Sequence, residues 1–384
     1  MEQIMEREET LLSRRAFAGM LGAGATYAAL NPKILGANQP ELMPLKSGAG
    51  VVRLSANENP YGPSQPAIKA MKDAFSLAWR YPDEYADALV ETIARLHSVG
   101  REQVILGDGS GEILKLCASA FTNSSKKVVL AEPTFEAIMR YAAASGGEAL
   151  KVALTQDYRH DLAKMLDASS DAGLIYICNP NNPTGTITLK EDVRAFLGKL
   201  PQTVAVLVDE AYYHYAETND YESVIPLISE HSNLIVARTF SKIYGMAGLR
   251  CGYAVAQASA IKSLREHQVW DNVNIMAVVA ANASLDDSKH VEDGRRVNSE
   301  TKRFLYNELE RLGFKYIPSQ TNFMMIDLRR DARPLIAAMK GRGVEVGRFF
   351  PALPNFMRVT IGRRSEMQAF LSAFRELIQS NVNA

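Results

Sequence analysis

The sequence has few residues that could form a disulfide framework or a metal site. Only three cysteines occur in 384 residues, Cys117, Cys178 and Cys251, and each lies in an apolar run with no short spacing to another. Cysteines in such a setting behave as small buried hydrophobic residues. The six histidines are scattered, and the sequence contains neither HExxH nor Cys-x-x-Cys. It therefore predicts no metal centre.

An excess of charge of one sign is also missing. The 43 lysines and arginines balance the 43 aspartates and glutamates, so the formal net charge is +0. Nucleic-acid-binding proteins and proteins that bind membrane surfaces usually carry a basic patch. The balance argues against both partners. The chain shows no internal repeat or low-complexity segment, and its length with 47% hydrophobic residues indicates two or three domains with a large core.

Residues 1–37 have the pattern of a targeting segment. The stretch SRRAFAGM, Ser13–Met20, places two adjacent arginines before a phenylalanine, and a weakly apolar stretch follows to Leu30. The small residues in Leu35–Ala37 suit a cleavage site. The segment resembles a twin-arginine export signal, and it has too few strongly apolar residues for a stable membrane span of about twenty. We predict an exported, periplasmic protein. The alternative is an amphipathic N-terminal arm on a cytoplasmic protein.

The middle of the chain alternates between short apolar runs and helical patterns. Strands are expected at Val104–Leu106, Val128–Leu130, Leu174–Cys178, Val204–Val208, Leu234–Ala237 and Cys251–Val255, and helices at Gln65–Ala78, Ala86–Val99, Ile113–Ala120, Leu189–Leu200 and Tyr221–Ser229. Such alternation predicts an α/β fold with a mostly parallel central sheet. Ligands of these sheets bind outside the carboxyl ends of the strands.

The last part of the chain has a different texture. A charged helix is expected at Arg295–Leu312, and short strands without long intervening helices follow it. This pattern indicates a smaller α+β domain. The predicted organisation is a targeting segment at 1–37, an N-terminal arm with part of the small domain at 38–75, a large cofactor domain at 76–290 and the C-terminal small domain at 291–384.

The stretch RTFSKIYGMAGLR, Arg238–Arg250, follows one of the predicted strands and has Lys242 near its middle. A free lysine amine titrates near pH ~10.4 and is a poor nucleophile at neutral pH, whereas a lysine held as an imine with an aldehyde cofactor escapes that limit. Thr239, Ser241 and Arg250 are donors suited to a phosphate. An aldehyde with a phosphate indicates pyridoxal 5′-phosphate. The simpler interpretation is a solvated loop lysine.

Polar side chains at the ends of other strands suit the same cofactor. Asp209 could pair with a protonated pyridine nitrogen, and Tyr212 and Asn182 could bond the ring oxygen. Phe135 could stack on the ring. The turn GDGSGE, Gly107–Glu112, opens a helix whose free N–H groups could meet the phosphate. Taken singly, each residue also has a structural interpretation, such as an Asn-Pro turn or a core aromatic.

With these residues placed, the chain resembles the fold-type I pyridoxal phosphate aminotransferases, which have the aspartate aminotransferase-like fold, and within them the histidinol-phosphate aminotransferase group. The matching stretches lie between Val51 and Gly362, and they are ANENPYGP, RYPD, GDGSGE, EPTFE, CNPNNPTG, VDEAYYHY, RTFSKIYGMAGLRCGY, QTNFMMIDL and FMRVTIG. The pair CNPNNPTG and RTFSKIYGMAGLR is highly specific.

The resemblance implies a role for each matching residue. Lys242 would bind the cofactor and move the proton, with Asp209, Tyr212, Asn182 and Phe135 around the ring. The phosphate would be bound by Ser110, Gly111, Thr239, Ser241 and Arg250, with Tyr81 from the other subunit of a homodimer. Arg358 would bind the substrate carboxylate, and Tyr61, Asn59 and Arg348 would face the substrate. Gly111 and Asp108 depart from the family pattern, where an acidic residue and Asn are frequent.

The implied reaction moves an amino group from histidinol phosphate or an L-amino acid, including aromatic ones, to a 2-oxo acid such as 2-oxoglutarate. Two alternatives share most of the site. One is a pyridoxal phosphate-dependent decarboxylase of a phosphorylated amino acid, since sequence does not show which bond of the substrate is aligned for cleavage. The other is a non-catalytic cofactor-binding module, although no DNA-binding segment is evident before Val51.

Overall fold

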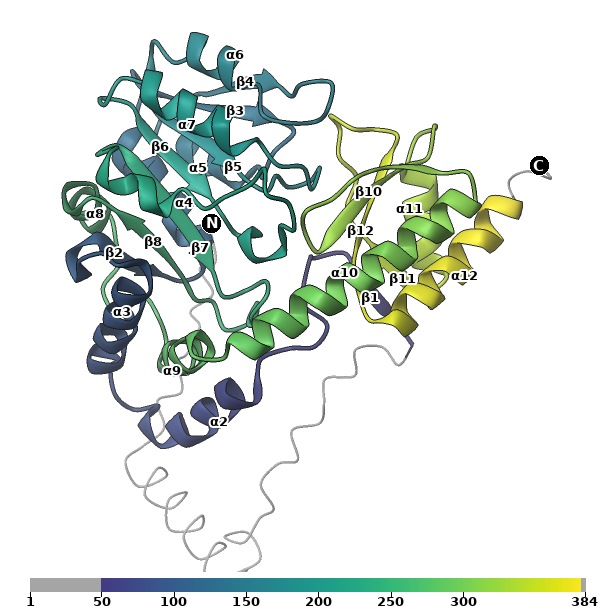
Figure 1. The fold of residues 1–384 in the computed structure, drawn as a ribbon, viewed down its shortest axis with the longest axis horizontal. Helices are drawn as coiled ribbons and strands as arrows, with labels where there is room; N and C mark the ends of the chain where they lie inside the picture. Colours follow the sequence, from purple (N-terminus) through teal and green to yellow (C-terminus); the bar gives the residue numbers. More distant parts are fainter. Residues whose placement is uncertain (1–49, 381–384) are drawn as a thin grey trace, which may run out of the picture. The chain divides into compact units, whose positions relative to one another are not determined.

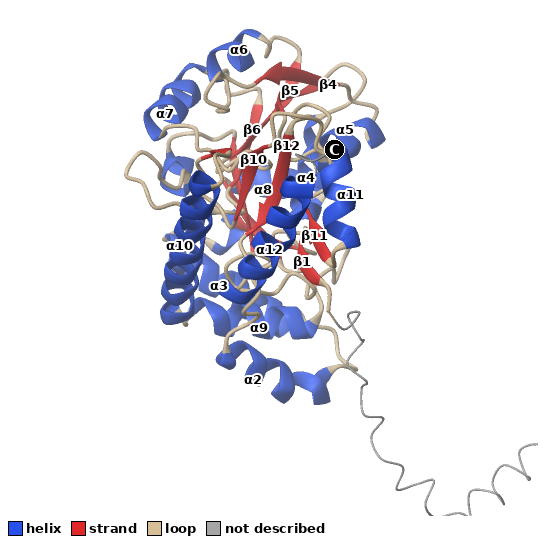
Figure 2. Ribbon diagram, turned by 90° about the vertical axis from the view of Figure 1, so that its right-hand side faces the viewer, coloured by secondary structure: helices blue, strands red, loops and turns tan. Residues whose placement is uncertain are grey.

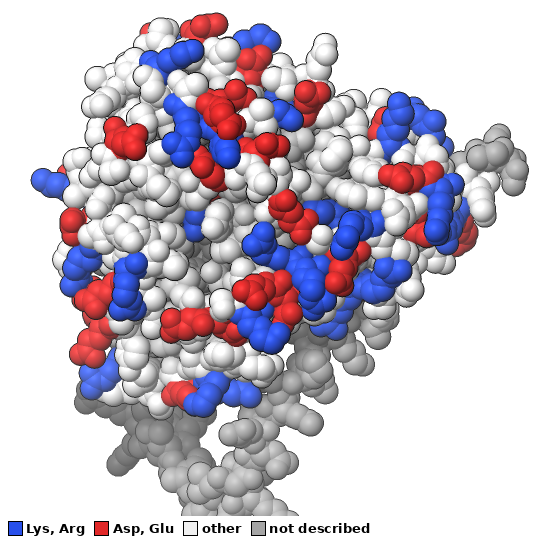
Figure 3. Space-filling view, viewed as in Figure 1, with Lys and Arg blue, Asp and Glu red and all other residues white. Residues whose placement is uncertain are grey.

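The structure is a computed structural model that describes residues 50–380 of the 384. The targeting segment predicted at 1–37 and most of the arm that follows it lie outside the described residues. Within residues 50–380, no helix is both long enough and apolar enough to cross a membrane. On the face shown in Figure 3, lysines and arginines are interspersed with aspartates and glutamates.

A seven-stranded sheet forms the centre of the larger part of the fold (Figure 1). The strand order is β2-β8-β7-β6-β5-β3-β4. The pairs β4–β3, β3–β5, β5–β6 and β6–β7 are parallel, and β8 runs antiparallel to β2 and β7. The strands are β2 (Val104–Gly107), β3 (Lys127–Glu132), β4 (Ala149–Ala153), β5 (Ala172–Cys178), β6 (Ala205–Asp209), β7 (Leu234–Thr239) and β8 (Gly252–Ala256). The prediction of an α/β protein with a mostly parallel sheet is confirmed.

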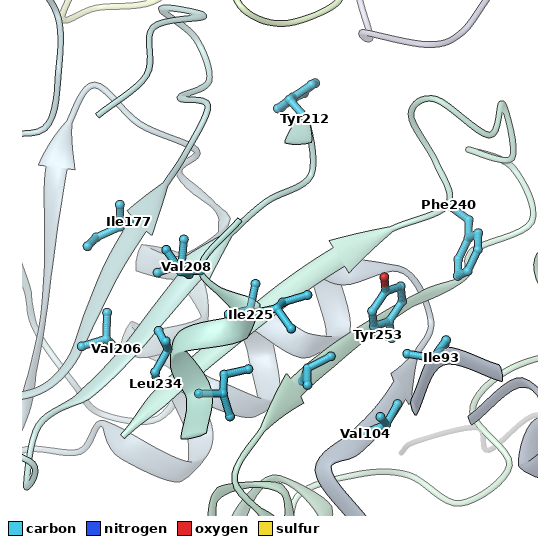
Figure 4. Packing of buried hydrophobic residues seen from close by; sticks show 14 of the residues in the cluster. Ile93, Val104, Ile177, Val206, Val208, Tyr212, Ile225, Leu234, Phe240 and Tyr253 are labelled. Carbon is cyan, nitrogen blue, oxygen red and sulfur yellow. The ribbon is translucent and has the colours of Figure 1, made fainter. Parts of the chain in front are cut away.

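Helices cover both faces of this sheet. One face packs against α4 (Ser110–Phe121), α5 (Ala137–Ala144) and α8 (Ala258–Arg265). The other face packs against α3 (Asp83–His97), α6 (Leu162–Asp167), α7 (Lys190–Lys199) and α9 (Ile275–Leu285), and α2 (Gln65–Ala74) lies against α9. Figure 4 shows Val206, Val208 and Leu234, which belong to the hydrophobic core on this second face. The residues that alternate with them along the same strands belong to the core on the first face. Because both faces are covered, the central strands are apolar except at their carboxyl ends.

The smaller part of the fold contains two short sheets. In the first, β10 (Phe323–Asp327) lies between β12 (Phe356–Thr360) and β9 (Lys315–Ile317), and both pairings are antiparallel. In the second, β1 (Val52–Leu54) is parallel to β11 (Val344–Val346). The sheets share one hydrophobic core with the helices α10 (Ser288–Arg311), α11 (Arg333–Gly341) and α12 (Arg364–Ser380) (Figure 2). This arrangement matches the predicted α+β domain.

Two helices expected from the sequence have different bounds in the structure, and one strand was not expected. The helix expected at Tyr221–Ser229 is only a 3-10 turn, Ile225–Ser229. Pro226 would lie in the interior of the expected helix, where it has no N–H to donate to the carbonyl four residues earlier, and the loop before the turn is bound to Glu210. Helix α10 begins at Ser288 and not at Arg295, capped by the Asp287 side chain. The edge strand β4, which is half exposed, was not expected, since its apolar pattern is short and broken by a lysine.

Candidate active site

A cavity of about 310 Å³ lies at the carboxyl ends of β5, β6 and β7, where Cys178, Asp209 and Thr239 enter its wall. Parallel strands present their carboxyl ends at one edge of the sheet, so residues far apart in sequence meet there. Twelve of the predicted site residues line the cavity: Ser110, Gly111, Phe135, Asn182, Asp209, Tyr212, Thr239, Ser241, Lys242, Arg250, Arg348 and Arg358.

Lys242 is the lysine that lines this cavity. Its Nζ donates a hydrogen bond to the Asn57 carbonyl oxygen at 3.3 Å and lies 5.5 Å from the centre of the Tyr212 ring. Burial, and then the nearby charge of Arg358, lowers the pKa of Lys242 to about 8. A much larger fraction of this amine than of an ordinary lysine is therefore neutral near physiological pH, as a nucleophile or a proton acceptor requires.

Asp209 is a buried carboxylate that hydrogen bonds only to neutral donors. Its two oxygens accept from the Tyr176 hydroxyl at 2.9 Å and the Ala211 N–H at 3.0 Å. Burial raises the pKa of Asp209, whereas these hydrogen bonds and the positive charge of Lys242 oppose the rise. A cation beside this carboxylate would recover much of the cost of its burial. The protonated nitrogen of a pyridine ring is such a cation.

Tyr212 and Asn182 are joined in one hydrogen-bond network. The Tyr212 hydroxyl accepts from the side-chain amides of Asn57 at 3.0 Å and Asn182 at 3.5 Å. The Asn182 carbonyl oxygen accepts from Arg358 Nη1 at 2.8 Å. Because the hydroxyl already accepts from two amides, its own hydrogen is free to bond a ring oxygen in the cavity.

A cluster of donors at the start of α4 suits a phosphate. Ser110 and Gly111 open the helix, and Arg250 donates to Ser241 Oγ at 3.2 Å and to the carbonyl oxygens of Ala247 and Asp108 at 3.0 and 3.3 Å. A Cβ atom on Gly109, where φ is +71°, would lie 2.0 Å from Arg250 Nη2. Glycine is therefore needed for the guanidinium to approach the helix start. The free N–H groups, hydroxyls and guanidinium together match a phosphate dianion.

These groups fit pyridoxal 5′-phosphate at both ends. The phosphate donors and the buried Asp209 line the same cavity as Lys242, and the exposed side of the cavity carries Phe135. A carboxylate for the ring nitrogen, donors for the ring oxygen and an amine for the aldehyde are all present. Among the described residues, no group of three or more His, Cys, Asp and Glu side chains could hold a metal ion.

Arg358 is buried on the small-domain side of the cavity. Its Nη2 donates to the Ser55 carbonyl oxygen at 2.9 Å, and its Nε has no hydrogen-bond partner. Burial lowers the pKa of Arg358 to about 10, and the group stays charged at neutral pH. A buried guanidinium that bonds only neutral oxygens favours an anionic ligand. A substrate carboxylate or phosphate would meet that requirement.

The strand ends that carry Asp209 and Thr239 are held by a buried ion pair. Arg238 donates to Glu210 Oε2 through Nη2 at 2.8 Å and through Nε at 3.0 Å, and both side chains are buried. Side chains alternate along a strand, so this pair lies on the sheet face opposite to Asp209 and Thr239. Glu210 also accepts from the Val224 N–H at 2.8 Å, which attaches the following loop.

Three predicted site residues do not line the cavity. Asn59 donates to the Ile243 carbonyl oxygen at 2.8 Å and so supports the lysine loop from outside. Tyr61 is half exposed, with the Arg363 guanidinium 5.5 Å from its ring. Tyr81 is 76% exposed. Their contacts with substrate or with a second subunit remain predictions.

The structure also adds residues that were not expected. Asn57 is buried with a φ of 54°, and it bonds both Tyr212 and Lys242. Its N–H donates to Thr360 Oγ1 at 3.0 Å, across 303 residues of sequence. Tyr176, the partner of Asp209, lies inside an apolar strand. The Asn-rich loop was a signal for Asn57, whereas Tyr176 could have been found only from the strand register.

The family model for aminotransferase class I and II matches residues 49–374. This chain belongs to the class I and II aminotransferases. It is 42% identical to the histidinol-phosphate aminotransferase of Moorella thermoacetica over 332 residues, which cover 85% of this chain and 86% of that relative. The fold, the family and the cavity together identify a pyridoxal phosphate-dependent transaminase, as the sequence predicted.

Solved structures agree with this assignment. Histidinol-phosphate aminotransferase from Sinorhizobium meliloti, in complex with pyridoxal 5′-phosphate, matches this aminotransferase with a TM-score of 0.81 and 27% identity, over 86% of this chain and 91% of that one. An aspartate aminotransferase mutant from Thermus thermophilus matches with a TM-score of 0.75 and 21% identity, over 84% and 95% of the two chains. The second likeness shows the fold alone, which is the aspartate aminotransferase-like fold.

The shifted pKa of Lys242 predicts how its reactivity depends on pH. In the cofactor-free aminotransferase, the rate of acetylation at Lys242 should rise with pH, and the midpoint of this rise should lie near pH 8. Below that pH most of the amine is protonated and unreactive. Arg358→Gln should move the midpoint upward, because it removes a neighbouring positive charge. Peptide mass spectrometry after timed labelling measures both effects.

The control for this measurement is Lys302 in the same samples. Burial lowers its pKa to about 8 as well, without a contribution from Arg358. Its midpoint should therefore stay constant in Arg358→Gln. An unchanged midpoint at Lys242 in that variant would contradict the proposed coupling between the two side chains.

Proposed function

We propose that this transaminase takes its amino group from histidinol phosphate, or from an amino donor of the same anionic class, and passes it to a 2-oxo acid such as 2-oxoglutarate. The observation that carries the proposal is the buried Arg358 guanidinium, which bonds neutral oxygens and faces the same cavity as Lys242. Both substrates carry an anionic group, and the relatives at 35–42% identity bear the name of this activity.

Binding of substrate depends on side chains on both sides of the cavity. Arg358 would hold the phosphate of the donor or a carboxylate of the oxo acid, and its bond to Asn182 links that anion to the residues around the cofactor ring. Because Phe350 lies 5.1 Å from the guanidinium, an apolar surface would adjoin the bound anion. A substrate held in this fixed geometry has its reacting C–H bond aligned for cleavage.

Proton movement would depend on Lys242 and on the groups that hold the ring. Bound pyridoxal phosphate supplies an electron sink for the bond that breaks at the amino-bearing carbon. The Lys242 amine would accept that proton and deliver it to the cofactor carbon that receives the amino group, which its pKa of about 8 favours. Asp209 would keep the ring nitrogen protonated, and Tyr212 would donate to the ring oxygen. The two half-reactions then alternate at one site.

A half-reaction screen tests the substrate. The purified cofactor-loaded protein is mixed with histidinol phosphate or with single L-amino acids, including aromatic ones, and bleaching of its visible absorbance is followed. We expect the largest response with histidinol phosphate, because its phosphate brings more negative charge to Arg358 than the carboxylate of an amino acid does. Lys242→Ala should lose both turnover and the cofactor attachment that borohydride fixes, whereas Lys302→Met, altered outside the cavity, should keep them.

Three outcomes of the screen would contradict the proposed donor, the proposed reaction or the role of Lys242. A response confined to free amino acids would show that the donor is an amino acid and not histidinol phosphate. Release of carbon dioxide without amino transfer would identify a decarboxylase. Full activity in Lys242→Ala would remove the role assigned to that amine.

We propose that the protein acts as a homodimer whose sites are shared between subunits. Tyr81 is exposed and absent from the cavity of its own chain, and the adjoining Pro82 lies in a hollow of about 760 Å³ with Trp270, which is 91% exposed. Exposed aromatic residues gathered around a concave surface are typical of subunit contacts. A second copy seated there would cover Trp270, and its Tyr81 would bring a further hydroxyl to the phosphate site.

Subunit complementation tests the shared site. Lys242→Ala and Tyr81→Ala should each be strongly impaired, but subunits exchanged between them should recover activity, because a mixed dimer holds one site with both native residues. Samples mixed without a dissociation step are the control and should show only the sum of the parent activities. Recovery that never exceeds this sum would refute sharing of Tyr81.

We also propose that the protein is exported by a twin-arginine route. The Arg14-Arg15 pair, with Phe17 two residues after it, supports this, as does the run of small residues that ends at Ala37. Expression of the full chain should give a periplasmic protein whose N-terminus lies near Asn38, and Arg14→Lys with Arg15→Lys should retain it in the cytoplasm. Full-length wild-type protein confined to the cytoplasm would show that the segment is no signal.

A further inference from the structure

Arg348 lines the cavity but already has a carboxylate partner. Its Nη2 donates to Glu136 Oε2 at 2.6 Å, and its Nη1 donates to the Phe349 carbonyl oxygen at 3.1 Å. The two charged side chains are 52% and 44% exposed. Glu136 follows Phe135, which also lines the cavity, so the carboxylate is held close to the ligand space without being part of its wall.

Arg358 provides the contrast. Both guanidinium groups face the ring of Phe350, at 4.3 Å for Arg348 and 5.1 Å for Arg358. Arg358 is buried and bonds only neutral oxygens, whereas the charge of Arg348 is balanced by Glu136. Arg358 can therefore bind an anion directly, whereas Arg348 can bind one only after the carboxylate of Glu136 has been displaced.

The partners of this ion pair come from different parts of the fold. Glu136 immediately precedes α5 of the larger domain, and Arg348 follows β11 of the smaller one. A half-exposed pair is weakly bound, because water screens the charges and long side chains lose freedom on pairing. A ligand anion placed against Arg348 can therefore exchange with Glu136 at little cost.

We propose that Glu136 determines specificity by competing with the second anionic group of a ligand for Arg348. The proposal rests on the proposed function, in which one cavity must accept two different substrates in turn. An oxo acid with two carboxylates would use Arg358 for one and draw Arg348 away from Glu136 with the other. A donor that contacts only Arg358 would leave the ion pair between Arg348 and Glu136 intact. When no second anion is bound, Glu136 thus balances the charge of Arg348, which lies beside the apolar ring of Phe350.

Equilibrium binding of two unreactive probes tests this role. Glutarate carries two carboxylates, and 3-phenylpropanoate carries one with an apolar tail. Isothermal titration of the cofactor-loaded protein should show that Glu136→Gln tightens glutarate binding about threefold, which is the effect expected from removing a weak competitor. The Kd of 3-phenylpropanoate should not change, because that ligand leaves Arg348 alone.

Glu132→Gln is the matched control. Glu132 lies four residues earlier and forms an ion pair of the same length with Lys151, 2.6 Å, at similar exposure, but it does not line the cavity. This variant should leave both probes unchanged. With Arg348→Leu in the background, Glu136→Gln should no longer affect glutarate, so the two substitutions should be non-additive.

The outcomes separate this inference from the proposed function. Weaker glutarate binding in Glu136→Gln, or an equal change for both probes, would overturn the competition and indicate that Glu136 only positions Arg348. Transamination by the wild type together with such a result would reject the inference alone. Selective tightening of glutarate in a protein that transfers no amino group would support the inference and reject the proposed function.

Discussion

The geometry of the site depends on the buried ion pair between Arg238 and Glu210. The two residues lie on neighbouring strand ends, and each is followed or preceded by a residue that faces the cavity. The pair therefore fixes the position of β6 relative to β7 on the sheet face opposite to the cavity, while Asp209 and Thr239 face the ligand. Buried pairs add little stability by themselves, but they disfavour arrangements in which the partners are apart. Here that selectivity sets the positions of the ring carboxylate and of the loop with Lys242.

On the cavity side of the same strand ends, charge is buried without full compensation. Lys242, Asp209 and Arg358 are enclosed together, and their hydrogen bonds in the described structure end on neutral groups. Burial shifts the pKa of each toward its neutral form. Such an arrangement costs folding free energy and favours a ligand that brings the complementary charges. The protein is in this sense preorganised for its cofactor and for an anionic substrate.

The sequence allowed the fold class and most of the cavity wall to be predicted. Alternating apolar runs indicated the parallel sheet, and the polar residue at each strand end indicated the site, because both depend on local pattern. The errors occurred where distant contacts decide. Pro226 and Glu210 together prevent a helix after Tyr221, and the turn at Asn57 directs that residue, which was not predicted, into the cavity. Tyr176 was missed since an apolar strand gives no sign of a polar partner on its neighbour.

The contacts between the segment after β1 and strand β12 have a consequence for the synthesis of the chain. Ser55 and Asn57, just beyond β1, bond Arg358 and Thr360 of β12, about 300 residues later in the sequence. The wall of the cavity thus contains the start and nearly the end of the described chain. A nascent polypeptide cannot complete it on the ribosome until the last strand has emerged. The complete cofactor site therefore exists only after the chain has been synthesised through β12.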